Sequence, residues 1–259
     1  MNQQDVKRLA RYLAQAEADV REVPGIIKEF ADLTMDDGYV IQKELLALKL
    51  SQGHKHIGYK MGLTSKAKMI QMKQDKPSYG FLCDYMMITD GGRLKTAELI
   101  HPRAEPEIAF IIDKEIKGKI GRDDVLKAIA YVTAATEILD SRYINFQFTM
   151  PDVIADNGSS ARVVVGRNLK RLGDANLASL GIGIWINGEL MGSGTGMDVL
   201  EDPLNSIVML SELMSAQGQS IAANSLILSG AVTPAFHIKK GDVVITRVED
   251  LSDATFTCV

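Results

Sequence analysis

One alternating segment, AEPEIAFIID at residues 104–113, constrains the fold of this chain more than any other. Period-two alternation is typical of a β-strand, in which residues i and i+2 point to the same face. Glu105 and Glu107 therefore project side by side from one face, while Ile108, Phe110 and Ile112 cover the other. Two neighbouring carboxylates repel each other and are costly to bury without a partner. A divalent cation would remove both problems.

A third carboxylate, Glu137, occurs in a similar setting. The segment TAATEILDSR also reads as a strand, and Ala135 and Leu139 share the face of Glu137. Three carboxylates with no His or Cys nearby form a hard oxygen site, which suits Mg²⁺ or Mn²⁺ better than zinc. The alternative is a solvated strand face with ordinary salt bridges, because Glu-x-Glu is common in exposed strands.

Two further segments carry polar groups that could take part in chemistry. Lys60 lies in a glycine-flanked, strand-like run, GYKMG. Burial near a metal would tune its pKa for proton transfer or enolate stabilisation, whereas an edge-strand lysine would simply face water. The run DNGSS at 156–160 could bind a carboxylate through backbone N–H groups and hydroxyls, or it could be only a turn.

The arrangement of predicted elements indicates an α+β fold rather than a doubly wound sheet, because helices and strands are segregated more than they alternate. We expect an N-terminal helical segment at 1–55 and a mixed, strand-rich β catalytic core at 56–259. Local signals are a capping box at Thr34 and Asp37, a hairpin turn at Asn187-Gly188, and helices at 65–72, 122–132 and from Asp202-Pro203 to Gly218.

Composition excludes several functional classes. The net charge is −4 with charges mixed along the chain, so nothing suggests nucleic-acid binding. No apolar run is long enough to span a bilayer, and the N-terminus has no apolar signal core. The two cysteines have neither CxxC nor zinc-site spacing, so a disulfide framework is not expected. A soluble protein of the cytoplasm is the expectation.

Five motifs in order resemble one family over essentially the whole chain. They are GYKMGLTSKAKM at 58–69, PSYGFL at 77–82, EPEIAF at 105–110, EILDSR at 137–142 and ADNGSS at 155–160. They are similar to the hydratase/decarboxylase family of the fumarylacetoacetate-hydrolase-like superfamily, which includes 4-oxalocrotonate decarboxylases and 2-oxopent-4-enoate hydratases. The resemblance implies a Mg²⁺ or Mn²⁺ site, no organic cofactor and an active-site lysine. The implied metal ligands are Glu105, Glu107 and Glu137, the lysine is Lys60, and the implied substrate-binding residues are Leu63, Ser78, Asp156, Ser159 and Ser160.

Ser78 favours the decarboxylase within this family. Hydratases carry an acidic residue at this position, where a carboxylate helps to activate water and protonate carbon. A neutral Ser78 would leave room for the carboxylate that departs as CO₂, although the family more often has a branched apolar residue there. The implied reaction is the metal-dependent decarboxylation of 2-oxo-3-hexenedioate (4-oxalocrotonate) to 2-hydroxy-2,4-pentadienoate in the meta-cleavage degradation of aromatic compounds. The resemblance also implies a homo-oligomer and a complex with the sister hydratase.

Three alternatives stay open at this point. The first is the hydratase itself, which adds water to the dienol. The second is a carbon–carbon bond hydrolase of the same superfamily, for which the expected His-Glu pair is not apparent near the N-terminus. The third is an inactive subunit that scaffolds a partner enzyme, against which the presence of Lys60 and the three glutamates argues.

Overall fold

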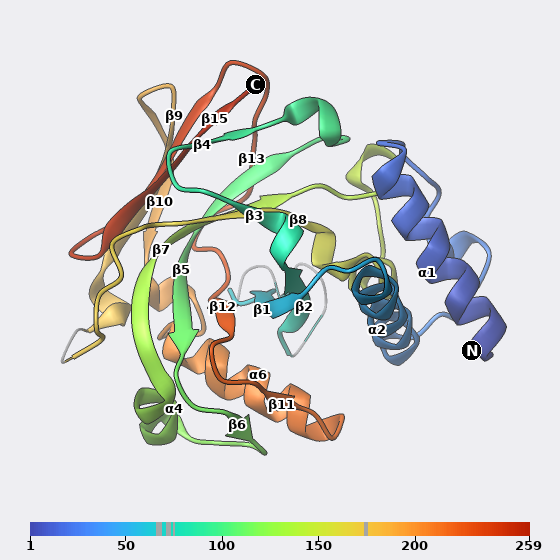
Figure 1. Ribbon diagram of the computed structural model, residues 1–259, viewed down its shortest axis with the longest axis horizontal. Coiled ribbons are helices and arrows are strands. Elements are labelled where there is room, and N and C mark those ends of the chain that lie inside the picture. The colour runs from blue at the N-terminus through green and yellow to red at the C-terminus, as the bar shows by residue number, and fades with distance from the viewer. Residues whose placement is uncertain (66–68, 71–73, 75, 174–175) are drawn as a thin grey trace.

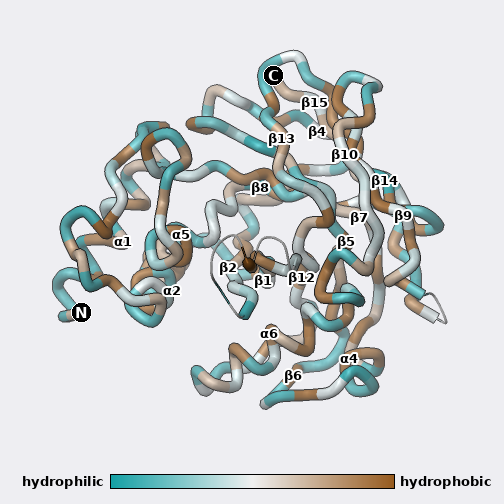
Figure 2. Tube along the Cα trace, turned by 180° about the vertical axis from the view of Figure 1, so that it is seen from behind, coloured by the Kyte–Doolittle hydropathy of each residue, from teal (hydrophilic) through white to brown (hydrophobic). Residues whose placement is uncertain are grey.

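The computed structural model describes residues 1–65, 69–70, 74, 76–173 and 176–259. Two helices, α1 (Gln3–Ala18) and α2 (Met35–Ser51), precede the first strand and pack against each other. The predicted capping box begins α2: the Thr34 hydroxyl accepts from the Asp37 N–H, and the Asp37 carboxylate accepts from the Thr34 N–H. Hydrophobic and hydrophilic residues mix along α1, as expected for a helix with one buried face (Figure 2).

An eight-stranded sheet forms the centre of the part of the chain that the structure describes (Figure 1). Antiparallel pairing predominates, and two strand pairs are parallel, β1 (His56–Gly62) with β12 (Leu226–Leu228) and β3 (Met87–Ile88) with β8 (Ser160–Val165). The strand order along the sheet is β2 (Ser78–Cys83), β1 (His56–Gly62), β12 (Leu226–Leu228), β5 (Arg103–Ile112), β7 (Ile129–Leu139), β8 (Ser160–Val165) and β3 (Met87–Ile88), with β13 (Phe236–His237) also paired to β5.

A second, five-stranded sheet covers one face of β5 and β7. Its order is β10 (Glu189–Thr195), β9 (Gly181–Ile186), β14 (Val243–Val248), β15 (Ser252–Cys258) and β4 (Gly92–Leu94). A two-stranded ribbon and three further α-helices are also described, together with several short 3-10 helices: β6 (Ile116–Lys117), β11 (Ser220–Ile221), α4 (Arg122–Ala128), α5 (Met150–Ala155) and α6 (Leu204–Ala216).

The two faces of β5 enter different hydrophobic cores. Ile108 and Phe110 are fully buried in a core that includes Val244 and Phe256 of the second sheet. Ala109, on the opposite face, belongs to a core that includes residues of α1 and α2. The opposite face is also the one that carries Glu105 and Glu107, so the predicted alternation is confirmed. The acidic residues lie on the side of the sheet away from the second sheet.

Most local predictions are confirmed, and one is wrong in extent. Asn187 and Gly188 both have positive φ, 54° and 84°, as the two-residue hairpin between β9 and β10 requires. Helix α6 lies within the expected range, whereas the helix predicted over 122–132 ends at Ala128. Ile129, Tyr131 and Val132 instead pair with β5, because β-branched and aromatic side chains suit a sheet. Most of the helix predicted through Met72 falls outside the described residues.

Asn157 joins the two ends of the curled eight-stranded sheet. The side-chain amide of Asn157 donates to the Phe81 carbonyl at 3.0 Å, and its oxygen accepts from the Phe81 N–H at 2.7 Å. In this way Asn157 imitates a strand residue and joins β2, at one end of the sheet, to the loop that precedes β8. Among the described residues, no helix has both the length and the apolarity that crossing a membrane requires.

Candidate active site

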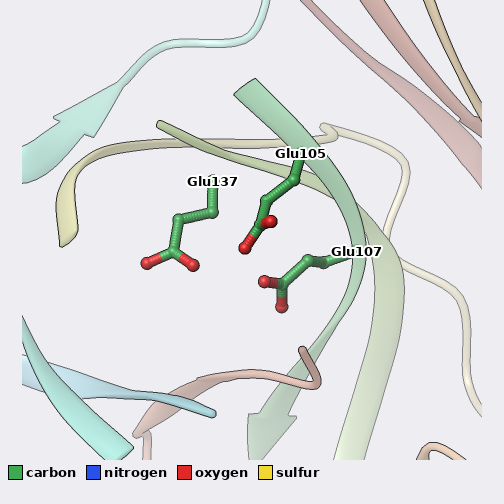
Figure 3. A group of neighbouring side chains, drawn as sticks. All are labelled: Glu105, Glu107 and Glu137. Atoms are coloured by element: carbon green, nitrogen blue, oxygen red, sulfur yellow. The ribbon is translucent and has the colours of Figure 1, made fainter. Parts of the chain in front are cut away.

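Three carboxylates converge on the concave side of the eight-stranded sheet (Figure 3). Glu105 of β5 lies directly opposite Glu137 of β7 in the antiparallel register, and Glu107 follows two residues later on the same face. One carboxylate oxygen from each of the three side chains lies within 4.8 Å of the other two. The side chains are buried, with Glu105 5% exposed and Glu107 and Glu137 fully inaccessible. Like charges placed opposite each other in a sheet are destabilising, so this arrangement requires positive charge.

The hydrogen bonding of these glutamates leaves room for a cation. Glu107 Oε2 accepts from the Gly230 N–H at 2.6 Å, but Glu107 Oε1 and Glu137 Oε1 are buried without a hydrogen-bond partner among the residues that the structure describes. Burial and the two neighbouring carboxylates raise the pKa of Glu107 well above its ordinary value. A cluster of hard oxygen donors with unsatisfied atoms fits a divalent cation of the Mg²⁺ or Mn²⁺ type.

Lys60 supplies a fixed positive charge beside the triad. Its Nζ lies 2.9 Å from Glu137 Oε2 and 3.4 Å from the Gly158 carbonyl oxygen. The residue is only 4% exposed, so it is not the solvent-facing edge lysine that was the alternative. Burial opposes the charge on Lys60, but Glu137, Glu105 and Glu107 outweigh it and raise the pKa of the amine. The lysine is therefore held as an ammonium group.

A cleft with a volume of about 560 Å³ opens onto this cluster. Lys60 and Glu105 reach its wall from the buried cluster, and Leu63 and Ser78 line it as expected. The remaining described residues of the wall are Gly62, Arg103, Leu139, Phe146, Gln147, Phe148, Met150, Val153, Gly158, Pro234 and Ala235. Apolar side chains thus surround a small number of polar groups, which is the usual composition of a small-molecule site.

The 156–160 loop contributes to the cleft wall through its backbone more than through the side chains that were predicted to bind substrate. Asn157, Gly158 and Ser159 all have positive φ, between 54° and 62°, which is a costly conformation for two residues with a Cβ. Gly158 is the residue of this loop that occurs among the described residues of the cleft wall. Ser159 and Ser160 are both buried. Burial raises the pKa of Glu137, and Lys60 and the Ser160 hydroxyl oppose this shift.

Asp156 is not among the described residues that line the cleft, and its role in substrate binding stays a prediction. Its carboxylate is completely buried and forms an ion pair with the Arg142 guanidinium. Asp156 Oδ2 also accepts from the Arg142 N–H at 3.1 Å. Burial raises the pKa of Asp156 to about 7, and Arg142 opposes this shift. Asp156 therefore shapes the loop, because its charge is already paired.

Among the wall residues that the sequence interpretation missed, Arg103 and Phe146 contact each other. The Arg103 guanidinium carbon lies 4.0 Å from the centre of the Phe146 ring. Arg103 precedes Glu105 by two residues, so the same alternation that identified the glutamates could have placed it on the acidic face. Phe146 and the adjacent Asn145 have positive φ angles of 59° and 56°, and no sequence pattern predicts this strained turn.

Comparison of the sequence with known proteins gives consistent matches. A family model described as fumarylacetoacetate (FAA) hydrolase C-terminal matches residues 56–259. The chain is 39% identical over 254 residues to a 4-oxalocrotonate decarboxylase of Pseudomonas sp. (strain CF600), covering 97% of this chain and 96% of that protein. It is 33% identical over 244 residues to a 2-hydroxyhexa-2,4-dienoate hydratase of Comamonas testosteroni, covering 93% and 92% of the two chains.

A solved structure matches the whole fold. The 4-oxalocrotonate decarboxylase from Pseudomonas putida G7, complexed with magnesium and adipate, superposes with a TM-score of 0.97 at 36% identity. The match covers 100% of this chain and 99% of that one. That relative has the same fold as this chain, and its structure contains magnesium and a dicarboxylate.

Proposed function

The chain belongs to the fumarylacetoacetate hydrolase family, and on this premise we propose that it decarboxylates 2-oxo-3-hexenedioate (4-oxalocrotonate) to 2-hydroxy-2,4-pentadienoate and CO₂. The observation that carries the proposal is the cleft whose wall holds Lys60, Glu105 and a neutral Ser78, with Glu107 and Glu137 buried beside Glu105. The named decarboxylase relative is more similar in sequence than the named hydratase, 39% against 33%. The reaction belongs to the meta-cleavage degradation of aromatic compounds.

The chemistry requires an electron sink, which the substrate provides. The 2-oxo group is conjugated to a double bond, so the distal carboxylate is that of a vinylogous β-keto acid. When the bond to this carboxylate breaks, its electron pair moves through the double bond to the ketone oxygen and CO₂ leaves. A divalent cation held by Glu105, Glu107 and Glu137 would supply Lewis-acid stabilisation of that oxygen. No organic cofactor is needed.

The residues of this chain perform the other tasks. The Lys60 ammonium, held by Glu137, places a positive charge at the inner end of the cleft where the dienolate develops. It also carries the proton that can convert the dienolate to the neutral dienol. Leu63 and the apolar wall exclude water from this charge, which strengthens the electrostatic interactions. Ser78 offers a hydroxyl without a charge to the departing group.

Assembly is part of the proposal. The dienol product is unstable, so direct transfer to the sister hydratase would protect it, and we infer that the two enzymes associate. Self-association is supported by apolar side chains on β10, an end strand of the second sheet, and on the turn that follows it: Leu190, Met191 and Met197 are 50%, 39% and 62% exposed. The proposed setting is the cytoplasm, with a small 2-oxo dicarboxylate as substrate.

One pair of assays tests the proposed reaction. The purified protein with Mg²⁺ is incubated with 2-oxo-3-hexenedioate, and CO₂ release is measured. The same preparation is incubated with 2-hydroxy-2,4-pentadienoate, and loss of the dienol is followed. Faster release of CO₂ supports the decarboxylase. Faster hydration of the dienol would establish the alternative, a hydratase, and inactivity toward both substrates would favour a scaffolding subunit.

A further inference from the structure

Arg103 is a cation in the cleft wall, and no acidic partner for it occurs among the residues that the structure describes. It is half-buried, and its Nε is buried without a hydrogen-bond partner among the described residues. Within the same described set, no carboxylate lies within ion-pair distance of the guanidinium, although this protein contains many such pairs. A partly buried cation that is not compensated is costly, so an anion from outside the chain would stabilise it.

The surroundings of Arg103 orient the guanidinium without neutralising it. The Phe146 ring stacks against it at 4.0 Å. His237 is the partner of Arg103 in the β13–β5 register, and an imidazole adds no negative charge. The nearby His101 is occupied by Glu22, with Nδ1 3.0 Å from the glutamate oxygen. The carboxylate of Glu22 is therefore engaged by His101, and it also accepts from the Asn145 N–H at 3.0 Å.

The position of Arg103 relates it to the acidic triad. It shares a strand face with Glu105 and Glu107, and it lies two residues, roughly 7 Å along a strand, from Glu105. Both Arg103 and Glu105 line the same cleft. A planar guanidinium is well suited to a carboxylate, because its N–H groups match two oxygen atoms.

We propose that Arg103 binds the retained carboxylate of the substrate, the one adjacent to the 2-oxo group. This inference rests on the proposed function. The choice between the two carboxylates follows from the chemistry. A cation bound to the departing carboxylate would stabilise it more than the neutral CO₂ that it becomes, and so would oppose the reaction. A cation on the retained carboxylate holds the substrate in place and keeps its charge pairing through the reaction.

Binding measurements test this assignment without depending on turnover. The Mg²⁺-loaded protein is titrated with 2-oxopentanoate, which has the 2-oxo acid group but no distal carboxylate. We expect Arg103→Met to weaken binding by about 10- to 100-fold, as loss of a charge-assisted hydrogen-bonded pair predicts. Arg103→Lys should weaken it less. Arg93→Met, which removes an exposed arginine from β4, should have no effect.

A second ligand separates loss of the ionic contact from collapse of the cleft wall. The wild-type protein should prefer 2-oxopentanoate to its neutral amide, and Arg103→Met should abolish that preference while Mg²⁺ affinity stays unchanged. Unchanged affinity of Arg103→Met for 2-oxopentanoate would overturn the assignment, as would a loss that appears only with 2-oxo dicarboxylates. If the wild-type protein bound 2-oxopentanoate through Arg103 but released no CO₂, the proposed reaction would fail and this inference would stand.

Discussion

The Lys60 ammonium lies 2.9 Å from the Glu137 carboxylate, although their strands are not neighbours. Strands β12 and β5 lie between β1 and β7 in the sheet. Three interstrand steps would separate the backbones by roughly 14 Å in a flat sheet. Curvature of the sheet and the reach of two long side chains therefore bring this pair together. The catalytic proposal depends on that curvature, because the same concave surface gathers Lys60 and the metal-site glutamates.

Glu107→Gln should weaken Mg²⁺ binding by at least about 10- to 100-fold, because even residues that only support metal ligands have effects of that size. Glutamine keeps the shape and can still accept from the Gly230 N–H, but it removes the negative charge. Isothermal titration with Mg²⁺ measures the change, and Glu115→Gln on the surface is the matched control. EDTA should abolish activity and Mg²⁺ or Mn²⁺ should restore it. Unchanged Mg²⁺ affinity of Glu107→Gln would show that the site is assigned wrongly.

Lys60→Met should lower kcat by about 10²- to 10⁴-fold, with a much smaller change in KM. The positive charge of Lys60 matters most when negative charge develops on the substrate, so its effect is on the transition state. Steady-state kinetics with 2-oxo-3-hexenedioate measure both constants, and Lys55→Met removes an exposed lysine as a control. A rise in KM at constant kcat would mean that Lys60 only binds substrate.

Ser78→Asp should lower kcat/KM for decarboxylation steeply, because the added charge weakens binding of the dianionic substrate, and it should leave Mg²⁺ binding intact. Two like charges about 4 Å apart at an effective dielectric near 20 repel by about 4 kcal/mol before relaxation. Ser78 lines the cleft beside Gly62, so an added charge would face the substrate. Ser78→Asn introduces a neutral side chain of the same size as aspartate, so it is the control for steric effects. Normal CO₂ release by Ser78→Asp would contradict the placement of the departing carboxylate.

Glu17→Gln should destabilise the protein at neutral pH by about 1.5–3 kcal/mol, the range for hydrogen bonds to charged groups. Glu17 Oε2 lies 2.6 Å from Lys49 Nζ, and Oε1 accepts from the Tyr85 hydroxyl at 3.2 Å. Burial opposes the charge on Glu17, but Arg142 and Lys49 outweigh it and lower the pKa of the carboxyl.

The sign of this shift sets the pH dependence of the effect. A lowered pKa means that the unfolded state binds more protons, so the contribution of Glu17 is present above its ordinary pKa of 4.5 and is lost as the pH falls through the lowered value. Denaturant unfolding at several pH values should therefore show wild type and Glu17→Gln converging in acid. Glu189→Gln, at an exposed position, should show no such trend. A difference that persists at low pH would mean that packing, and not charge, holds Glu17.

The sequence by itself determined features that depend on neighbouring residues. Strand periodicity placed Glu105 and Glu107 on one face, because successive side chains alternate whatever the rest of the chain does. The capping box at Thr34 and the hairpin at Asn187-Gly188 were predictable for the same reason. Local patterns also singled out Lys60 and Glu137, and the family motifs implied their roles, but neither indicated how these residues meet.

The tertiary structure alone decided how the separate segments converge. The register that sets Glu137 opposite Glu105 and the curvature that brings Lys60 to them arise from pairing between strands far apart in sequence. The same long-range packing paired Asp156 with Arg142 in an ion pair. It also placed Arg103 in the cleft wall without an acidic partner among the described residues. A local pattern specifies which way a side chain points, but its partner depends on which distant strand comes to lie beside it.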